Sequence, residues 1–219
     1  MITCYSCHHG NERPKDIPSL AMQYGTPEED PNEIEIPPQP ASGPSADQIL
    51  EKFVTALGGS QRLASSASLI ERGTYEGYDS YHEKEPFELY AKGPEQMTIV
   101  IHTQNGDSTT VVNGSAGWVA STSNPVPLLP LAPGAELDGA RLDAQLLFPG
   151  QIRQALSQWQ SGFPITTIGD SDVQAIEGRG AGRTRVKLFF EDKTGLLARQ
   201  LRYASTAVGT NPIQIDYAD

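Results

Sequence analysis

The chain has 219 residues, of which 37% are hydrophobic and 20% are charged, the composition of an ordinary soluble globular protein. Its formal net charge of −11 disfavours nucleic-acid binding, because phosphate binding needs a basic patch and no stretch of the chain supplies one. No apolar run approaches the roughly 18 residues of a membrane-spanning helix, and the first residues lack the basic-then-apolar pattern of a signal peptide.

The two cysteines of the chain, Cys4 and Cys7, are separated by two residues and followed directly by His8. This is the Cys-x-x-Cys-His pattern of c-type haem attachment. Each thiol can form a thioether with one vinyl group of the porphyrin, and the imidazole can serve as an axial ligand of the iron. The motif predicts that Cys4 and Cys7 hold haem c covalently and that His8 is the proximal iron ligand.

Three other interpretations of this motif stay open. A redox dithiol needs a thioredoxin-like βαβ context, and nothing near Cys4 predicts a strand that leads into a long helix. A zinc site needs four well-spaced ligands, and Cys4, Cys7, His8 and His9 are too crowded to supply all four. A chance match would leave a Cys4–Cys7 disulfide or two free thiols.

The sequence Cys-Tyr-Ser-Cys-His-His-Gly at residues 4–10, with prolines following, resembles the haem segments of the photosynthetic reaction-centre cytochrome c subunit family. The resemblance covers residues 2–18, and only Cys4, Cys7 and His8 carry its chemistry. It implies electron transfer to an unidentified redox partner protein. In that family the sixth iron ligand is usually an upstream methionine on a helix. This chain has no room for such a helix, so Met22 is the candidate sixth ligand, the alternative being a chance apolar residue of a linker.

Residues 19–44 differ in composition from the rest of the chain. Eight of the 17 prolines lie between positions 14 and 44, together with several acidic residues. Such a segment buries too little apolar surface to offset its ordering entropy, so it is predicted to be an extended linker after a haem-attachment segment of residues 1–18. Because covalent haem is attached outside the cytoplasm, we expect a periplasmic or other extracytoplasmic location. We also expect the chain to be a fragment whose export signal lies elsewhere.

A folded domain is predicted to cover residues 45–219. Ser45 and Gln48 form a capping box, and the apolar residues that follow recur at helical spacing until Gly58 and Gly59. A second short helix is expected over residues 60–65. Beyond Ser68 the apolar period changes to two, which predicts strands. The expected strands span residues 69–77, 87–92, 96–103, 108–113, 118–121, 165–168, 174–178, 183–191, 196–204 and 212–217.

Turn and helix signals complete this pattern. Asn105-Gly106 and Asn113-Gly114 predict hairpins between consecutive strands, and residues 192–195 predict a third, longer one. Helices are expected over residues 137–148 and 152–159, inserted among the strands so that they cover one face or plug one mouth of a curved sheet. The predicted fold class is therefore mainly β (α+β), an antiparallel incomplete β-barrel with helices.

The order of these signals gives a second resemblance. A helix ended by Gly58-Gly59, then Lys-Gly-Pro at 92–94, Gly-Trp at 117–118 and Phe-Phe-Glu-Asp-Lys-Thr-Gly at 189–195 are similar to the lipoprotein-localisation-factor type of periplasmic domain. The resemblance covers residues 45–219 and implies an incomplete β-barrel wrapped around helices, which in some members holds an acyl chain. Domains of this type usually continue past a Tyr-x-Asp such as residues 217–219, which again suggests a fragment.

Two functions follow from these features. The first is extracytoplasmic electron transfer by one covalent haem. The alternative is a non-redox module that binds a lipid or another apolar ligand in the concavity of the sheet. No serine or cysteine nucleophile stands at recognisable spacing from a base, so the chain is not predicted to be an enzyme. The residues expected on the apolar concave side are Phe87, Leu89, Ile99, Ile101, Val186 and Leu188.

Overall fold

The computed structural model describes residues 43–77, 80, 83–122, 126–180, 184–206 and 209–217. The predicted haem segment and all but the last two residues of the predicted linker lie outside these ranges. The described residues build two six-stranded antiparallel sheets, with helices between and beside them.

The folded region begins with the predicted capping box. The Ser45 hydroxyl accepts a hydrogen bond of 3.3 Å from the Gln48 backbone N–H, and the Gln48 side-chain oxygen accepts one of 2.8 Å from the Ser45 N–H. These bonds satisfy two of the free N–H groups at the start of α3 (Ala46–Ala56). The helix buries Ile49, Leu50 and Phe53 along one face and is followed by the short helix α4 (Ser60–Ala64).

Sheet A contains the first six strands in chain order, each antiparallel to the next. Its strands are β1 (Ser68–Tyr75), β2 (Glu85–Lys92), β3 (Gln96–Thr103), β4 (Gly106–Asn113), β5 (Ala116–Ser121) and β6 (Leu128–Pro130). Both predicted Asn-Gly turns lie between consecutive paired strands, so these two hairpins are confirmed. The sequence prediction missed β6, which contains a proline and pairs only with β5, as an edge strand that includes proline must.

Sheet B contains the later strands in the order β12-β11-β10-β9-β7, with β8 also paired to β9. Its strands are β7 (Ser157–Gln160), β8 (Thr166–Ile168), β9 (Ser171–Arg179), β10 (Arg185–Glu191), β11 (Leu197–Thr206) and β12 (Gly209–Asp216). The third predicted hairpin joins β10 to β11, where the Gly195 N–H donates to the Glu191 carbonyl over 2.9 Å. Apart from β7, these strands match the predicted ones to within a few residues.

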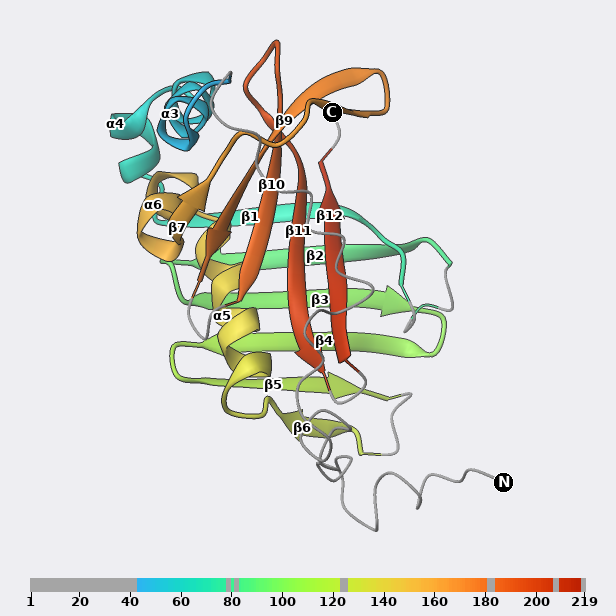
Figure 1. Cartoon of the computed structure of the whole chain (residues 1–219). Helices are drawn as coiled ribbons and strands as arrows, with labels where there is room; N and C mark the ends of the chain where they lie inside the picture. The colour runs from blue at the N-terminus through green and yellow to red at the C-terminus, as the bar shows by residue number, and fades with distance from the viewer. Residues whose placement is uncertain are drawn as a thin grey trace, which may run out of the picture.

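The helix α5 (Ala135–Leu146) lies between the two sheets, whose strands run crosswise to each other in Figure 1. It confirms the first of the two predicted inserted helices, and it contacts β3 and β4 on one side and β11 on the other. The helices α3 and α4 lie at one end of sheet B, near the short 3-10 turn η2 (Pro149–Gln151) and the helix α6 (Ile152–Ala155).

The second predicted helix, over residues 152–159, is wrong beyond its first turn. The backbone becomes extended at Leu156, with φ −122° and ψ 146°, and Trp159 lies on β7, paired to β9. The spacing of Leu156 and Trp159 resembles one face of a helix, but both side chains pack over Gly178 of β9. A Cβ at Gly178 would lie 2.9 Å from the Trp159 ring, so the absent side chain is what lets the indole lie against the strand.

The two sheets bury separate apolar clusters. The cluster of sheet A joins buried residues of β2, β3 and β4 to Ala144 of α5 and to Phe148. The cluster of sheet B joins β9 and β10 to α3 and to Leu142 of α5. The residues predicted for the concave side are confirmed as inward-facing: four are buried, and Phe87 and Ile99 pack against the cluster of sheet A.

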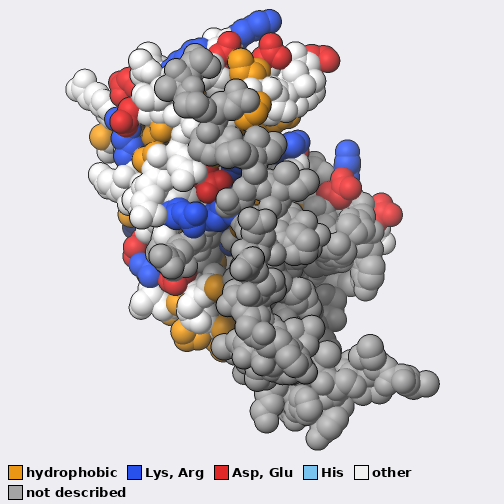
Figure 2. All heavy atoms as spheres, in the orientation of Figure 1, with side chains coloured by type: hydrophobic (Ala, Val, Ile, Leu, Met, Phe, Trp, Pro, Cys, Tyr) orange, Lys and Arg blue, Asp and Glu red, His pale blue; other side chains and the backbone are white. Residues whose placement is uncertain are grey.

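The fold class is therefore confirmed as mainly β, with antiparallel sheets, few helices and an open arrangement in place of a closed barrel. On the face shown in Figure 2, acidic and basic side chains are interspersed over the described surface. Within the described ranges, none of the helices is both long enough and apolar enough to cross a membrane.

Candidate functional site

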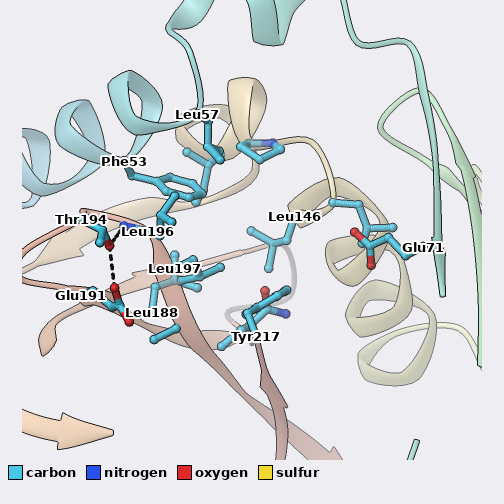
Figure 3. A pocket seen from close by; sticks show the side chains of 15 residues that line it. Phe53, Leu57, Glu71, Leu146, Leu188, Glu191, Thr194, Leu196, Leu197 and Tyr217 are labelled. Carbon is cyan, nitrogen blue, oxygen red and sulfur yellow. Dashed lines mark hydrogen bonds between the residues drawn. The ribbon is translucent and has the colours of Figure 1, made fainter. Parts of the chain in front are cut away.

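A cavity of about 370 Å³ opens beside the space between the two sheets. It is lined by parts of α3, β1, β10 and β11, by the C-terminal end of α5, and by Tyr217, which follows β12 (Figure 3). Its volume lies within the range of roughly 300–1,000 Å³ that is typical of small-molecule sites. The cavity is therefore the candidate binding site.

Ten of the fifteen lining residues are apolar. They are Phe53, Leu57, Leu146, Leu147, Pro149, Ile152, Leu188, Leu196, Leu197 and Ala198. Phe53 is fixed by an aromatic contact with Phe190, with 5.1 Å between ring centroids, while Leu57, Leu146 and Leu197 are only partly buried. Partly buried leucines on three different elements leave apolar surface that a ligand could cover. Of the residues predicted for the concave side, only Leu188 reaches the cavity.

Glu71 of β1 contributes a carboxylate to the lining. It occupies an inward-facing position of the edge strand, directly opposite the buried Leu89 of β2. Partial burial raises the pKa of Glu71 above its ordinary value. Figure 3 shows Glu71 on the right of the cavity and Glu191 on the left, with Leu146 and Leu197 between them.

Tyr217 lies near the Glu71 end of the cavity. Its backbone N–H donates to the Ala198 carbonyl of β11 over 2.9 Å, which continues the β11–β12 pairing by one residue. The side chain remains 40% exposed. Partial burial, together with the negative charges of Glu71 and Asp143, raises the pKa of the Tyr217 phenol, which therefore stays protonated and able to donate a hydrogen bond at neutral pH.

At the other end, Glu191 is held by its own turn. The Thr194 hydroxyl donates to the Glu191 carboxylate over 2.7 Å and accepts from the Leu196 N–H over 3.1 Å. The amine of Lys52 on α3 donates to the Asp192 carbonyl in the same turn. The turn between β10 and β11 is thereby fixed to α3 at this end of the cavity.

An ion pair joins β11 to α5, two of the elements that line the cavity. Arg202 of β11 binds Asp143 of α5 with two hydrogen bonds, of 2.7 Å from Nε and 2.6 Å from Nη2. The Arg202 side chain is nearly buried, because Gly139, one turn before Asp143 on the same helix, leaves room for the guanidinium. A Cβ at position 139 would lie 2.5 Å from Arg202 Nη1.

The residues predicted to hold haem are Cys4, Cys7 and His8, with Met22 as the sixth ligand. All four lie outside the described residues, so their assignment and the haem c cofactor stay predictions. The residues that the structure brings together at the cavity were not singled out from the sequence, apart from Leu188. A signal was present, because Glu71 interrupts the period-two pattern of β1 at an inward position.

Comparisons with known proteins give distant structural likenesses only. No protein-family model matches the chain, and no curated protein does. A LolA superfamily protein from Nitrosomonas europaea is 17% identical with a TM-score of 0.43, and the match covers 81% of this chain and 79% of that one. A DUF1329 family protein from Desulfovibrio piger is 11% identical with a TM-score of 0.40, covering 74% and 75%. Likenesses this distant do not assign a function.

The wider description of the chain as an electron-transport, metal-binding cytochrome of the photosynthetic reaction centre is wrong for the described residues. The solved structures named above are described as LolA superfamily and DUF1329 proteins. Across the described part of the chain, no group of three or more His, Cys, Asp or Glu residues could hold a metal ion. The cavity lining contains no His, Cys or Met to serve as an axial iron ligand.

Proposed function

We propose that this chain binds a lipid acyl chain, or an apolar ligand of similar shape, in the cavity between α3, α5 and sheet B. The observation that carries the proposal is the lining of that cavity, in which partly buried leucines of three elements face a space of about 370 Å³. Binding would remove this apolar surface from water, which contributes about 0.8 kcal/mol for each methylene group buried. The proposed role is binding without catalysis.

The resemblance of residues 45–219 to lipoprotein-localisation-factor domains agrees with this proposal and implies a periplasmic location, which we include in it. That resemblance rests on turns and strand patterns, so it supports the fold more directly than the ligand. The proposed ligand class is inferred from the cavity lining, and binding measurements at the cavity test it.

The test uses the whole chain and the uncharged fluorescent probe N-phenyl-1-naphthylamine. Saturable binding of the probe is expected, and alkyl alcohols of increasing length should displace it with affinities that rise roughly threefold to fourfold per methylene until the cavity is full. Leu146→Trp places an indole in the cavity and should weaken probe binding at least tenfold. Leu128→Trp is the matched control, because Leu128 is 59% exposed on β6, away from the lining.

A chain that binds no probe, or whose probe binding is the same in Leu146→Trp and Leu128→Trp, would contradict the proposal. Thermal unfolding of both variants checks that each is folded. Mass spectrometry of the purified chain provides an independent readout, because a co-purified lipid should be lost from Leu146→Trp and retained in Leu128→Trp.

A further inference from the structure

The charges around the cavity are unequal. Its fifteen lining residues include two carboxylates, Glu71 and Glu191, and no Lys or Arg. A ligand with a carboxylate or phosphate head group would therefore meet negative charge without a compensating cation. This asymmetry gives the first indication of which amphiphiles the cavity accepts.

The two carboxylates differ in their partners. Glu191 accepts the hydrogen bond from Thr194, whereas Glu71 has no hydrogen bond or ion pair with any of the described residues. The nearest sequence neighbour of Glu71, Arg72, points to the opposite face of sheet A and binds Glu88 over 2.8 Å. Glu71 is exposed to solvent, but its apolar surroundings desolvate part of its carboxylate, and a bound cation or hydrogen-bond donor would stabilise that charge.

Gln200 of β11 provides an independent observation. Gln200 also lines the cavity and is only 3% exposed. Its side-chain amide has no hydrogen-bond partner among the described residues. An amide offers an acceptor and two donors, so Gln200 can bind a polar head group.

Arg202, a cation close in sequence to Gln200, is held by another residue. Arg202 lies two residues after Gln200 on the same face of β11, but Asp143 binds its guanidinium with two hydrogen bonds. Tyr217, close enough to Glu71 for that charge to raise its pKa, adds a neutral phenol. The Glu71 end therefore combines one unpaired carboxylate with two neutral polar groups.

From this arrangement we propose that the cavity selects amphiphiles with an amine head group over those with a carboxylate head group. The ammonium group would bind Glu71, with the Gln200 side-chain oxygen as a second acceptor, and the alkyl chain would lie along Leu146 and Leu197. This selectivity rests on the proposed function, because it requires the same cavity to hold the chain.

The test compares three ligands of equal length, decylamine, decanol and decanoic acid, as displacers of N-phenyl-1-naphthylamine from the whole chain at pH 7.5, below their micellar concentrations. Decylamine should bind at least tenfold more tightly than decanoic acid, with decanol in between. In Glu71→Gln the preference for amine over acid should fall to threefold or less. Glu88→Gln removes the same charge from the outer face of sheet A and should leave the preference unchanged.

A measurement on the unchanged chain tests the same charge. Between pH 8 and pH 4 decylamine stays cationic and decanol stays neutral, so their affinity ratio should fall as Glu71 takes up a proton. The other titratable groups of the lining are Glu191 and Tyr217. Probe binding with equal or tighter displacement by the acid would overturn the selectivity and leave the lipid-binding function standing. Absence of probe binding would instead remove the proposed function itself.

Discussion

The inner faces of the two sheets are buried in different ways. Sheet A presents an apolar surface to α5, built from residues of β2, β3 and β4. Sheet B is apolar on β10, but on the neighbouring β11 two inward positions are the buried polar residues Gln200 and Arg202. The helix α5 therefore contacts sheet A through Ala144 and sheet B through both Leu142 and the ion pair of Asp143.

This difference explains where the cavity forms. Apolar side chains of sheet A can interdigitate with α5 and close the space between them. On the other side, α5 contacts β11 through the Arg202–Asp143 ion pair, and Leu146 at the end of the helix is only partly buried. The polar inward residues Glu71 of β1 and Gln200 of β11 thus lie where the apolar core ends and the cavity begins.

The largest expected effect comes from breaking the ion pair. Arg202→Met should lower the free energy of unfolding by about 3 kcal/mol, because it leaves Asp143 without its partner in a largely buried position. Urea unfolding monitored by circular dichroism measures this change. Arg199→Met is the matched control on the outer face of the same strand, where Arg199 pairs with the half-exposed Asp216 and should contribute less than about 1 kcal/mol. Equal losses in both variants would contradict the distinction between the faces.

Gly139 tests the same contact from the helix side. Alanine is the better helix former, yet Gly139→Ala should destabilise the chain by about 1–2 kcal/mol because its methyl group overlaps the Arg202 guanidinium. In the Arg202→Met background the loss should shrink, since a flexible methionine can move aside. Urea unfolding of the single and double variants measures the coupling. Additive effects of the two substitutions would show that Gly139 serves another purpose.

The smallest expected effect concerns Glu71 and pH. Its pKa is raised by burial, so below the unfolded-state value of about 4.3 the carboxyl is protonated in both states and carries no penalty. As pH rises through the higher folded-state pKa, the folded chain must accept a poorly solvated charge and loses stability. Glu71→Gln should therefore be more stable than the unchanged chain at pH 7, by on the order of a few tenths of a kcal/mol because solvent screens the group.

Glu88 gives the opposite sign on the outer face of sheet A. Hydrogen bonds from Tyr90 and Arg72 lower the pKa of Glu88, so its contribution is present above the unfolded-state pKa and lost as pH falls through the folded-state value. Glu88→Gln should therefore be less stable than the unchanged chain at pH 7. Thermal unfolding from pH 4 to pH 8 compares both variants, and shifts of the same sign would contradict the assignment of the two glutamates to different environments.

Most of the fold could be predicted from local signals. Period-two alternation and the turns at Gly106 and Gly114 located the strands of sheet A, and the Ser45 capping box located α3. The errors arose where local patterns were ambiguous. Leu156 and Trp159 are spaced as on a helix, but in extended backbone both side chains pack against Gly178 of β9. A contact between residues so far apart in the sequence leaves no local signal.

The site was harder to predict, because it depends on which face of each strand turns inward. On β11 two large apolar side chains, Leu201 and Tyr203, lie on the outer face, and Tyr203 packs there against Arg185 with 5.2 Å from the guanidinium to the ring centroid. Alternation alone would place these residues in the core. The inward Arg202 is explained by its ion pair with Asp143, 59 residues away in the sequence.

The strand order also has a consequence for how the chain folds. Every strand of sheet A pairs with its neighbour in the sequence, and β9 to β12 do the same in sheet B. Such pairings close short loops, so each sheet can assemble from successive hairpins at low entropic cost. The contacts of α5 with β3, β4 and β11 connect segments much further apart, so we expect the helix to dock after the hairpins have formed and the space between the sheets to be the last part of the molecule to become ordered.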